Sequence, residues 1–75
     1  MQAKIIIDLD NKEFGNPAQD GGAEMVGRLE DVLQRIFMNA EATRAVNVGD
    51  YVVAEDAKGN VIARMDLVSG RFKNN

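Results

Sequence analysis

Hydrophobic and polar residues alternate near the start of the chain, and this pattern predicts a β-strand from Lys4 to Leu9 with one buried face. Turn-forming residues follow at Asp10-Asn11 and Gly15-Asn16-Pro17, so the strand is expected to end there. The face expected in the core carries Ile5, Ile7 and Leu9, and the other face carries Ile6, Asp8 and Asp10.

A helical period comes next in the chain. Its apolar residues fall within an arc of about 140° on a helical wheel, which is typical of a helix that packs one stripe against a sheet. On the polar side, Glu24 precedes Arg28 and Asp31 precedes Arg35 at the i,i+4 spacing of stabilising ion pairs. The apolar stripe consists of Met25, Val26, Leu29, Val32, Leu33, Ile36, Phe37 and Ala40.

Two signals compete for the start of this helix. Asn16 followed by Pro17 is a capping pattern. Gly21-Gly22 would weaken a helix that ran through them by about 1 kcal/mol each. We therefore expect a turn or short helical turn from Pro17 to Gln19, and the main helix from about Ala23 to Met38.

A β-hairpin is predicted after the helix. Strands at Tyr51–Glu55 and Val61–Val68 flank the loop Asp56–Asn60, whose glycine suits a hairpin connection. Alternation in the second of these strands predicts a core face of Val61, Ala63, Met65 and Leu67, opposite Ile62, Arg64, Asp66 and Val68.

The element order β-α-β-β predicts an α+β fold in a single domain, residues 1–75. The expected architecture is a three-stranded, mainly antiparallel sheet with one helix packed on one face. The simplest arrangement places the last strand at the centre, and direct parallel pairing of the other two strands is the alternative. The ordered core is expected over about residues 3–68, followed by a loose tail at 69–75.

Composition narrows the class of protein. The chain is 45% hydrophobic and contains no cysteine and no histidine, so its stability must come from an apolar core rather than disulfides or zinc. Its net charge is −3 and its charges are interspersed, so we expect no nucleic-acid partner. Its longest aliphatic run is Ile5 to Ile7, too short to span a membrane, and no secretory signal is recognisable. A cytoplasmic location is expected.

Asp8 and Asp10 raise the question of metal chemistry. Alternation on a strand places them on one face about 6–7 Å apart, near enough to share a divalent cation. The sequence "DLDN" resembles the first strand of a phosphatase superfamily, which would make this a metal-dependent phosphoryl enzyme. Those enzymes need a much larger parallel sheet and further catalytic residues, so we favour solvated acids followed by a turn. A helix-loop-helix calcium site is excluded because Lys12 occupies the next alternate position.

Other catalytic patterns are weaker still. Gly21-Gly22 before the helix is similar to an anion-binding loop, but Asp20 and Glu24 would repel a phosphate. Nucleophilic catalysis has no cysteine or histidine to use and a single serine, Ser69, near the end of the chain. We therefore expect a protein that is not an enzyme and uses no cofactor or metal.

Two surfaces are candidates for protein contact. The uncovered sheet face is expected to present an apolar patch, including Val68, with a charged rim, a combination that often marks interfaces. The acidic side of the helix is the second candidate, and a homodimer that buries the open sheet face is an alternative. The residues expected to bind a partner are Ile6, Asp8, Asp10, Ile62, Arg64, Asp66, Glu24 and Asp31.

Several motifs together resemble a group of small, mostly uncharacterised bacteriophage and prophage proteins. These are Ile7-Asp8-Leu9-Asp10-Asn11, then Phe14 and Pro17, the helix beginning Ala23-Glu24-Met25-Val26-Gly27-Arg28-Leu29, and Asp56-Ala57-Lys58-Gly59-Asn60. The similarity covers most of residues 4–68. This chain departs from the group in its extra Gln19-Asp20-Gly21-Gly22 and in a longer stretch between helix and hairpin.

The resemblance implies a phage-encoded accessory protein that acts inside the bacterial host. Small proteins of this setting that lack catalytic residues often bind and inhibit a host defence or metabolic protein, and anti-CRISPR proteins are among them. The expected function is therefore a protein-interaction module that binds and modulates or inhibits a host protein.

Overall fold

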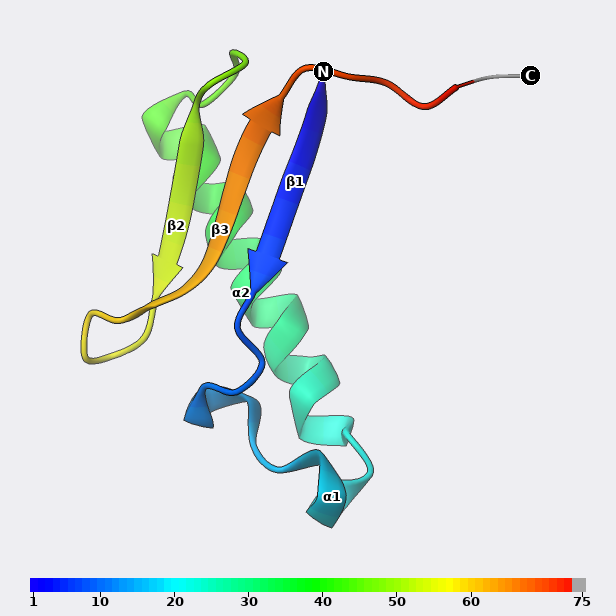
Figure 1. Ribbon diagram of the computed structural model, residues 1–75. Coiled ribbons are helices and arrows are strands. Elements are labelled where there is room, and N and C mark those ends of the chain that lie inside the picture. Colours follow the sequence, from blue (N-terminus) through cyan, green and yellow to red (C-terminus); the bar gives the residue numbers. More distant parts are fainter. Residues whose placement is uncertain (74–75) are drawn as a thin grey trace.

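The computed structural model describes residues 1–73, apart from the side chain of Asp20. Its elements in chain order are β1 (Gln2–Ile7), the 3-10 helix η1 (Lys12–Phe14), α1 (Pro17–Asp20), α2 (Ala23–Thr43), β2 (Tyr51–Glu55) and β3 (Val61–Val68) (Figure 1). The three strands form one antiparallel sheet in the order β1-β3-β2. The α+β fold with a central last strand is confirmed, and the parallel alternative is wrong. Of the expected tail, residues 69–73 have no regular structure and 74–75 lie outside the described residues.

The molecule has two layers, with α2 on one face of the sheet and no helix of the described chain on the other (Figure 1). It is correspondingly thin, with dimensions of 40 × 35 × 15 Å. The core lies between the layers and consists of side chains from α2, η1 and the sheet that face one another. Its buried members are Phe14, Val32, Ile36, Val52, Ala54, Ile62, Ala63, Met65 and Leu67.

β1 ends earlier than its sequence pattern predicts. The strand stops at Ile7, and the next residues form a turn in which the carboxylate of Asp8 accepts the N–H of Asp10 at 3.0 Å. Leu9 therefore leaves the expected core face and is 43% exposed. An aspartate that bonds backbone two residues further on favours a turn over continued strand pairing, which explains the early end.

β3 contains a bulge that reverses two predicted orientations. Ala54 pairs with Ala63, but Glu55 pairs with Val61, so Ile62 is one residue extra on β3. A bulge shifts the alternation of the strand by one position. As a result Ile62 is buried and only 1% exposed, whereas Val61 is 55% exposed. The prediction that Val61 faces the core and Ile62 faces outward is wrong.

The connection between β1 and α1 supplies a core residue. Asn11 caps η1 by accepting the N–H of Glu13 at 2.9 Å, and the 3-10 turn directs Phe14 into the core, where it is 1% exposed. The following helix α1 is capped by Asn16, which accepts the N–H of Ala18 at 3.1 Å. The short helical turn expected at this position is therefore present.

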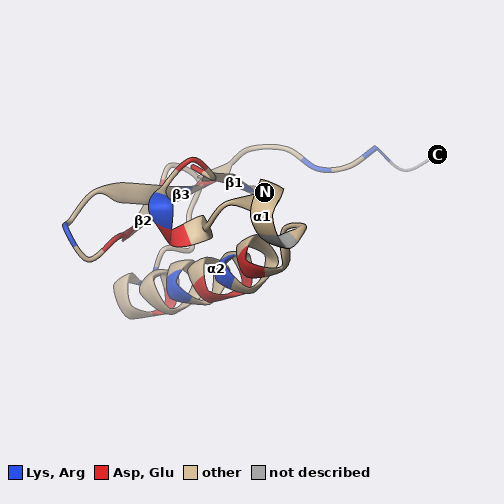
Figure 2. Cartoon of the chain, turned by 90° about the horizontal axis from the view of Figure 1, so that it is seen from below, with Lys and Arg blue, Asp and Glu red and all other residues tan. Residues whose placement is uncertain are grey.

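α2 runs five residues beyond its predicted end at Met38 and lies to one side of the sheet. It contacts β2, β3 and η1, but among the described residues no Cα atom of α2 lies within 8 Å of one in β1. The middle of its apolar stripe is buried as expected, whereas Val26 and Phe37 at one edge are each 54% exposed. Figure 2 shows acidic and basic residues interspersed along the outer side of the helix.

None of the helices described has the length and apolar character needed to cross a membrane.

Candidate protein-binding surface

The sheet face turned away from α2 brings together side chains from all three strands. The ladder places Ile6 opposite Arg64, which is opposite Val53 on β2. In the next row Lys4 is opposite Asp66, which is opposite Tyr51. Side chains directly opposite one another on antiparallel strands are close enough to touch. We call these six residues the open face: Lys4, Ile6, Tyr51, Val53, Arg64 and Asp66.

Arg64 is held in place at the centre of the open face. Its Nε lies 2.9 Å from Oδ2 of Asp66, and its Nη2 lies 2.9 Å from Oδ1, so the guanidinium engages the carboxylate at two points. Its Cζ also lies 4.1 Å from the centroid of the Tyr51 ring, the geometry of a cation–π contact. The hydrogen bonds from Arg64, and to a lesser extent the charges of Arg64 and Lys4, hold the pKa of Asp66 below its ordinary value.

Apolar surface surrounds this fixed charge pair. Ile6 is 60% exposed and Tyr51 55% exposed, although both lie in strands of the sheet. At the start of β3, the bulge turns Val61 outward, and this side chain is also 55% exposed. The open face therefore combines exposed apolar groups with an arginine whose conformation is already ordered, a combination suited to contact with another protein.

Three of the predicted sheet residues, Asp8, Asp10 and Ile62, do not lie on the open face. Asp8 and Asp10 are both exposed, but the turn that joins them replaces the strand on which they were expected to share one face. Ile62 is in the core and offers no surface to a partner. Of the sheet residues predicted to bind, Ile6, Arg64 and Asp66 do lie together on the open face.

The two predicted helix residues, Glu24 and Asp31, belong to the other layer. The carboxylate of Glu24 lies over Gly15, so close that a Cβ at that position would come within 2.5 Å of it. Asp31 forms an ion pair of 3.7 Å with Arg28, at i,i+3 spacing. Because basic residues alternate with these acids along α2, this side of the helix is a mixed surface and not an acidic one (Figure 2).

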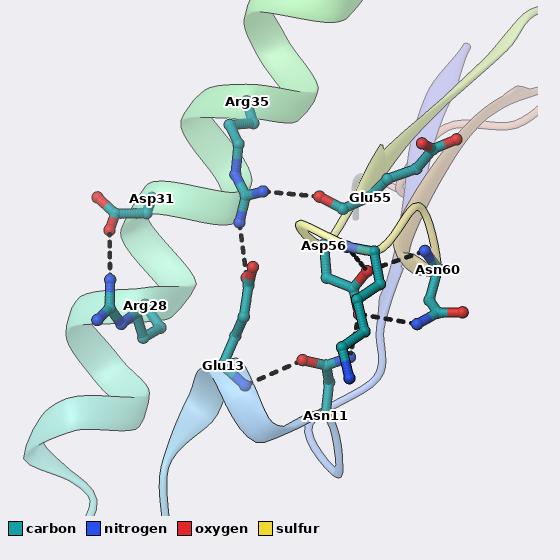
Figure 3. A network of polar contacts seen from close by, with 9 residues as sticks. Asn11, Glu13, Arg28, Asp31, Arg35, Glu55, Asp56 and Asn60 are labelled. Carbon is teal, nitrogen blue, oxygen red and sulfur yellow. Dashed lines mark hydrogen bonds and ion pairs between the residues drawn. The ribbon is translucent and has the colours of Figure 1, made fainter.

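A polar network joins η1, α2 and the hairpin (Figure 3). Arg35 does not pair with Asp31 as its spacing predicts. Its Nη2 donates to Oε2 of Glu13 at 2.9 Å, and its Nη1 donates to the backbone carbonyl of Glu55, also at 2.9 Å. The helix is thereby fixed against the outer edge of β2, which leaves the open face on the opposite side of the sheet uncovered.

Asp56 closes the hairpin loop in the same network. Its carboxylate accepts the backbone N–H groups of Lys58 and Asn60, each at 2.9 Å, and the side-chain amides of Asn60 and Asn11 at 3.1 and 3.2 Å. These hydrogen bonds, those from Asn60 above all, lower the pKa of Asp56 to about 2. Both carboxylate oxygens of Asp56 accept hydrogen bonds from the loop, and one also accepts from Asn11, so we assign Asp56 a structural role.

Sequence reasoning missed half of the open face, namely Lys4, Tyr51 and Val53. Alternation in Tyr51–Glu55 could have indicated that Tyr51 and Val53 share one side of their strand. Which residues of the neighbouring strands they meet depends on the register, and a local pattern does not specify it.

Within the described residues, no three acidic side chains gather where they could hold a metal ion. Comparison of the chain with protein-family models, with curated proteins and with solved structures finds no match.

Proposed function

We propose that the protein is a phage-encoded, non-catalytic interaction module that binds and inhibits a bacterial host protein through its open face. The observation that carries the proposal is the fixed Arg64, held between Tyr51 and Asp66 beside the exposed Ile6. The phage setting, the host partner and a cytoplasmic site of action are taken from the resemblance described above.

The energetics of protein interfaces support this choice of surface. Arginine and tyrosine are over-represented among the few residues that dominate binding energy. Ordering a flexible side chain on binding costs about 0.5–1.5 kcal/mol, and this cost is reduced for Arg64 because Asp66 and Tyr51 already order it. A sheet face left bare is also the kind of apolar surface that partner proteins cover.

The proposed partner presents an apolar patch that fits against Ile6 and Tyr51, with polar groups at its rim. The net charge of the open face is only +1, since Lys4 and Arg64 lie around a single acid, Asp66. We therefore expect affinity to depend on apolar contact and to change little with salt concentration.

The test uses two variants that introduce the same charge at equally exposed apolar positions. Ile6 on the open face is 60% exposed and Met38 on the outer side of α2 is 61% exposed. Tagged wild type, Ile6→Asp and Met38→Asp are each used to capture proteins from lysate of the bacterial host, and the captured protein is then purified and titrated by calorimetry. Circular dichroism of each variant checks the fold.

We expect Ile6→Asp to weaken binding by about tenfold or more, because it places a charge within an apolar contact. Met38→Asp should leave the affinity within about twofold of the wild type, since it lies in the other layer. Equal binding by wild type and Ile6→Asp would remove the open face from the proposal.

A further inference from the structure

The outer edge of β1 carries unpaired backbone groups. The N–H of Asp8 donates to the carbonyl of Ile62 at 2.8 Å, so even-numbered residues of β1 direct their backbone groups toward β3. The N–H and C=O groups of Ala3, Ile5 and Ile7 consequently point away from the sheet. No helix or strand of the described chain lies beside this edge (Figure 1), although the tail residues Arg71 and Phe72 line a pocket with its first residues, Met1 to Lys4.

The opposite edge of the sheet is partly occupied by α2. There the carbonyls of Val53 and Glu55 accept hydrogen bonds of 2.9 Å from the side chains of Asn39 and Arg35 on α2. Natural proteins protect free edges with prolines, bulges, charges or covering elements. β1 has none of these except Lys4, whose neighbour in the ladder is Asp66.

Apolar surface lies next to the free edge on the inner side of the sheet. Ile5 and Ile7 are only half-buried because α2 is displaced toward β2. Arg35 and Asn39 mark the flank of α2 that faces β2, so a helical wheel places Val26 and Phe37 on the flank toward β1, where both are 54% exposed.

We infer that a second copy of this chain pairs its β1 with this edge, antiparallel and about a twofold axis at Ile5. In this register Ala3 pairs with Ile7 of the second copy, Ile5 with Ile5, and Ile7 with Ala3. All three N–H and all three C=O groups of each free edge are then bonded. The two sheets become one sheet of six strands with both α2 helices on the same face, and the same patch is used by both copies.

Charge and strand length select this register over its neighbours. With the axis at Ile5, Lys4 lies opposite Ile6 of the second copy and diagonal to its Asp8. An axis at Lys4 would place two lysines directly opposite, which is destabilising. An axis at Ile6 would pair Ala3 with Leu9, which lies in the turn after β1 and is not available as strand.

The register can be tested by oxidative cross-linking, because the chain has no cysteine of its own. At the axis, the two Ile5 Cα atoms of a hydrogen-bonded antiparallel pair lie about 5.5 Å apart, within the range that a disulfide spans. Identical residues one position away lie diagonally, about 7–8 Å apart, which is too far. The variants are Lys4→Cys, Ile5→Cys and Ile6→Cys, each at micromolar concentration under mild oxidation.

We expect Ile5→Cys to form covalent dimers at least about tenfold faster than Lys4→Cys or Ile6→Cys alone. A mixture of Lys4→Cys and Ile6→Cys should cross-link faster than either variant by itself, because these positions lie opposite each other. Equal rates for all three variants would overturn the proposed register.

Dimerisation itself is measured by sedimentation equilibrium of the wild-type chain and of two variants of Ala3. By the alternation that the Asp8–Ile62 bond fixes, the N–H of Ala3 points away from β3, so Ala3→Pro removes a donor from the free edge and leaves the ladder with β3 intact. Ala3→Ser keeps that donor and is the matched control. We expect reversible dimers for wild type and Ala3→Ser, and dimerisation about tenfold or more weaker for Ala3→Pro.

A wild-type chain that stays strictly monomeric at high micromolar concentration would overturn the inference. So would equal dimerisation of Ala3→Pro and Ala3→Ser. Neither result bears on the proposed function, which rests on the open face and is tested by capture of a different protein.

Discussion

Asp56 shows how a single residue can organise a loop through ionisation. Its carboxylate accepts hydrogen bonds from Asn60, Lys58 and Asn11, and all of them favour the charged form. Its pKa accordingly falls from 3.8 to about 2 in the folded protein. A depressed carboxyl pKa stabilises the folded state above the unfolded pKa, and this stabilisation is lost as the pH falls through the folded pKa.

We therefore predict that Asp56→Ala lowers the melting temperature at neutral pH, and that the difference from wild type shrinks between about pH 4 and pH 2. Thermal unfolding followed by circular dichroism at several pH values measures this. Asp10→Ala is the control, because within the described part of the chain the exposed carboxylate of Asp10 accepts no hydrogen bond. A difference between Asp56→Ala and wild type that stayed constant down to pH 2 would contradict the prediction.

Ile62 and Val61 are neighbours of similar chemistry with opposite environments. We predict that Ile62→Ala costs about 2–5 kcal/mol of unfolding free energy, since it empties a fully buried site. Val61→Ala should cost about 1 kcal/mol or less, because that side chain is mostly in water. Urea denaturation of both variants measures the difference, and equal costs would be inconsistent with the bulge.

Residue by residue, simple alternation predicted the environment where the strand is regular. It correctly placed Ile6, Arg64 and Asp66 outside and Met65 and Leu67 inside. It failed at Ile62 because the bulge inserts one residue into the ladder, and no glycine or proline marks that position in the sequence.

Among the elements, α2 has an unusual C-terminus. Arg44 has φ 53° and ψ 48°, the left-handed conformation that glycine normally supplies after a helix. The N–H of Arg44 donates to Glu41 at 3.2 Å and the N–H of Ala45 donates to Ala40 at 3.0 Å, the paired bonds of a Schellman motif. The half-buried Ala45 and Ala40 then pack at the edge of the core and keep the arginine in this conformation.

We predict that Arg44→Gly raises the unfolding free energy by about 0.5–1 kcal/mol, because glycine adopts this backbone conformation without a Cβ clash. Arg44→Ala should bring no such gain, since its Cβ remains. Urea denaturation of both variants against wild type provides the measurement. Equal stability of the glycine and alanine variants would show that the conformation of Arg44 carries no strain.

The type and phase of each main element were predictable because apolar residues recur at periods of about 3.6 and 2. The residues at which these elements end were less predictable. β1 stops early through the side chain of Asp8, and α2 continues past Met38 to a cap without glycine. Phe14 enters the core from a connection, where no period exists to indicate burial.

For the whole molecule, the order of the strands followed from the short connections between four elements, which leave few arrangements. The lateral position of α2 was not predictable, since it depends on Arg35 and Asn39 reaching backbone carbonyls of β2. That position decides which edge of the sheet is free and which apolar residues remain exposed. Both proposed surfaces therefore depend on contacts that only the assembled fold contains.

Because the chain is short, its expected stability is small, and covering exposed apolar surface would change that stability noticeably. A folded chain of 75 residues is expected to have a net stability of roughly 4–11 kcal/mol. Its large exposed hydrophobic residues include Ile6, Phe37, Val46 and Tyr51. Covering part of that surface in a dimer would add stability that depends on protein concentration.

The hydrogen bonds from Arg35 and Asn39 to the outer strand also bear on how far the inferred association can extend. A sheet with unpaired backbone groups on both edge strands can pair with further copies at both edges, so that it grows without limit, as fibrils do. In this molecule α2 already bonds two carbonyls on the outer edge of β2, whereas no helix or strand of the described chain bonds the outer edge of β1. If β1 pairs with a second copy as inferred, we therefore expect assembly to stop at the dimer rather than to continue into an open-ended polymer.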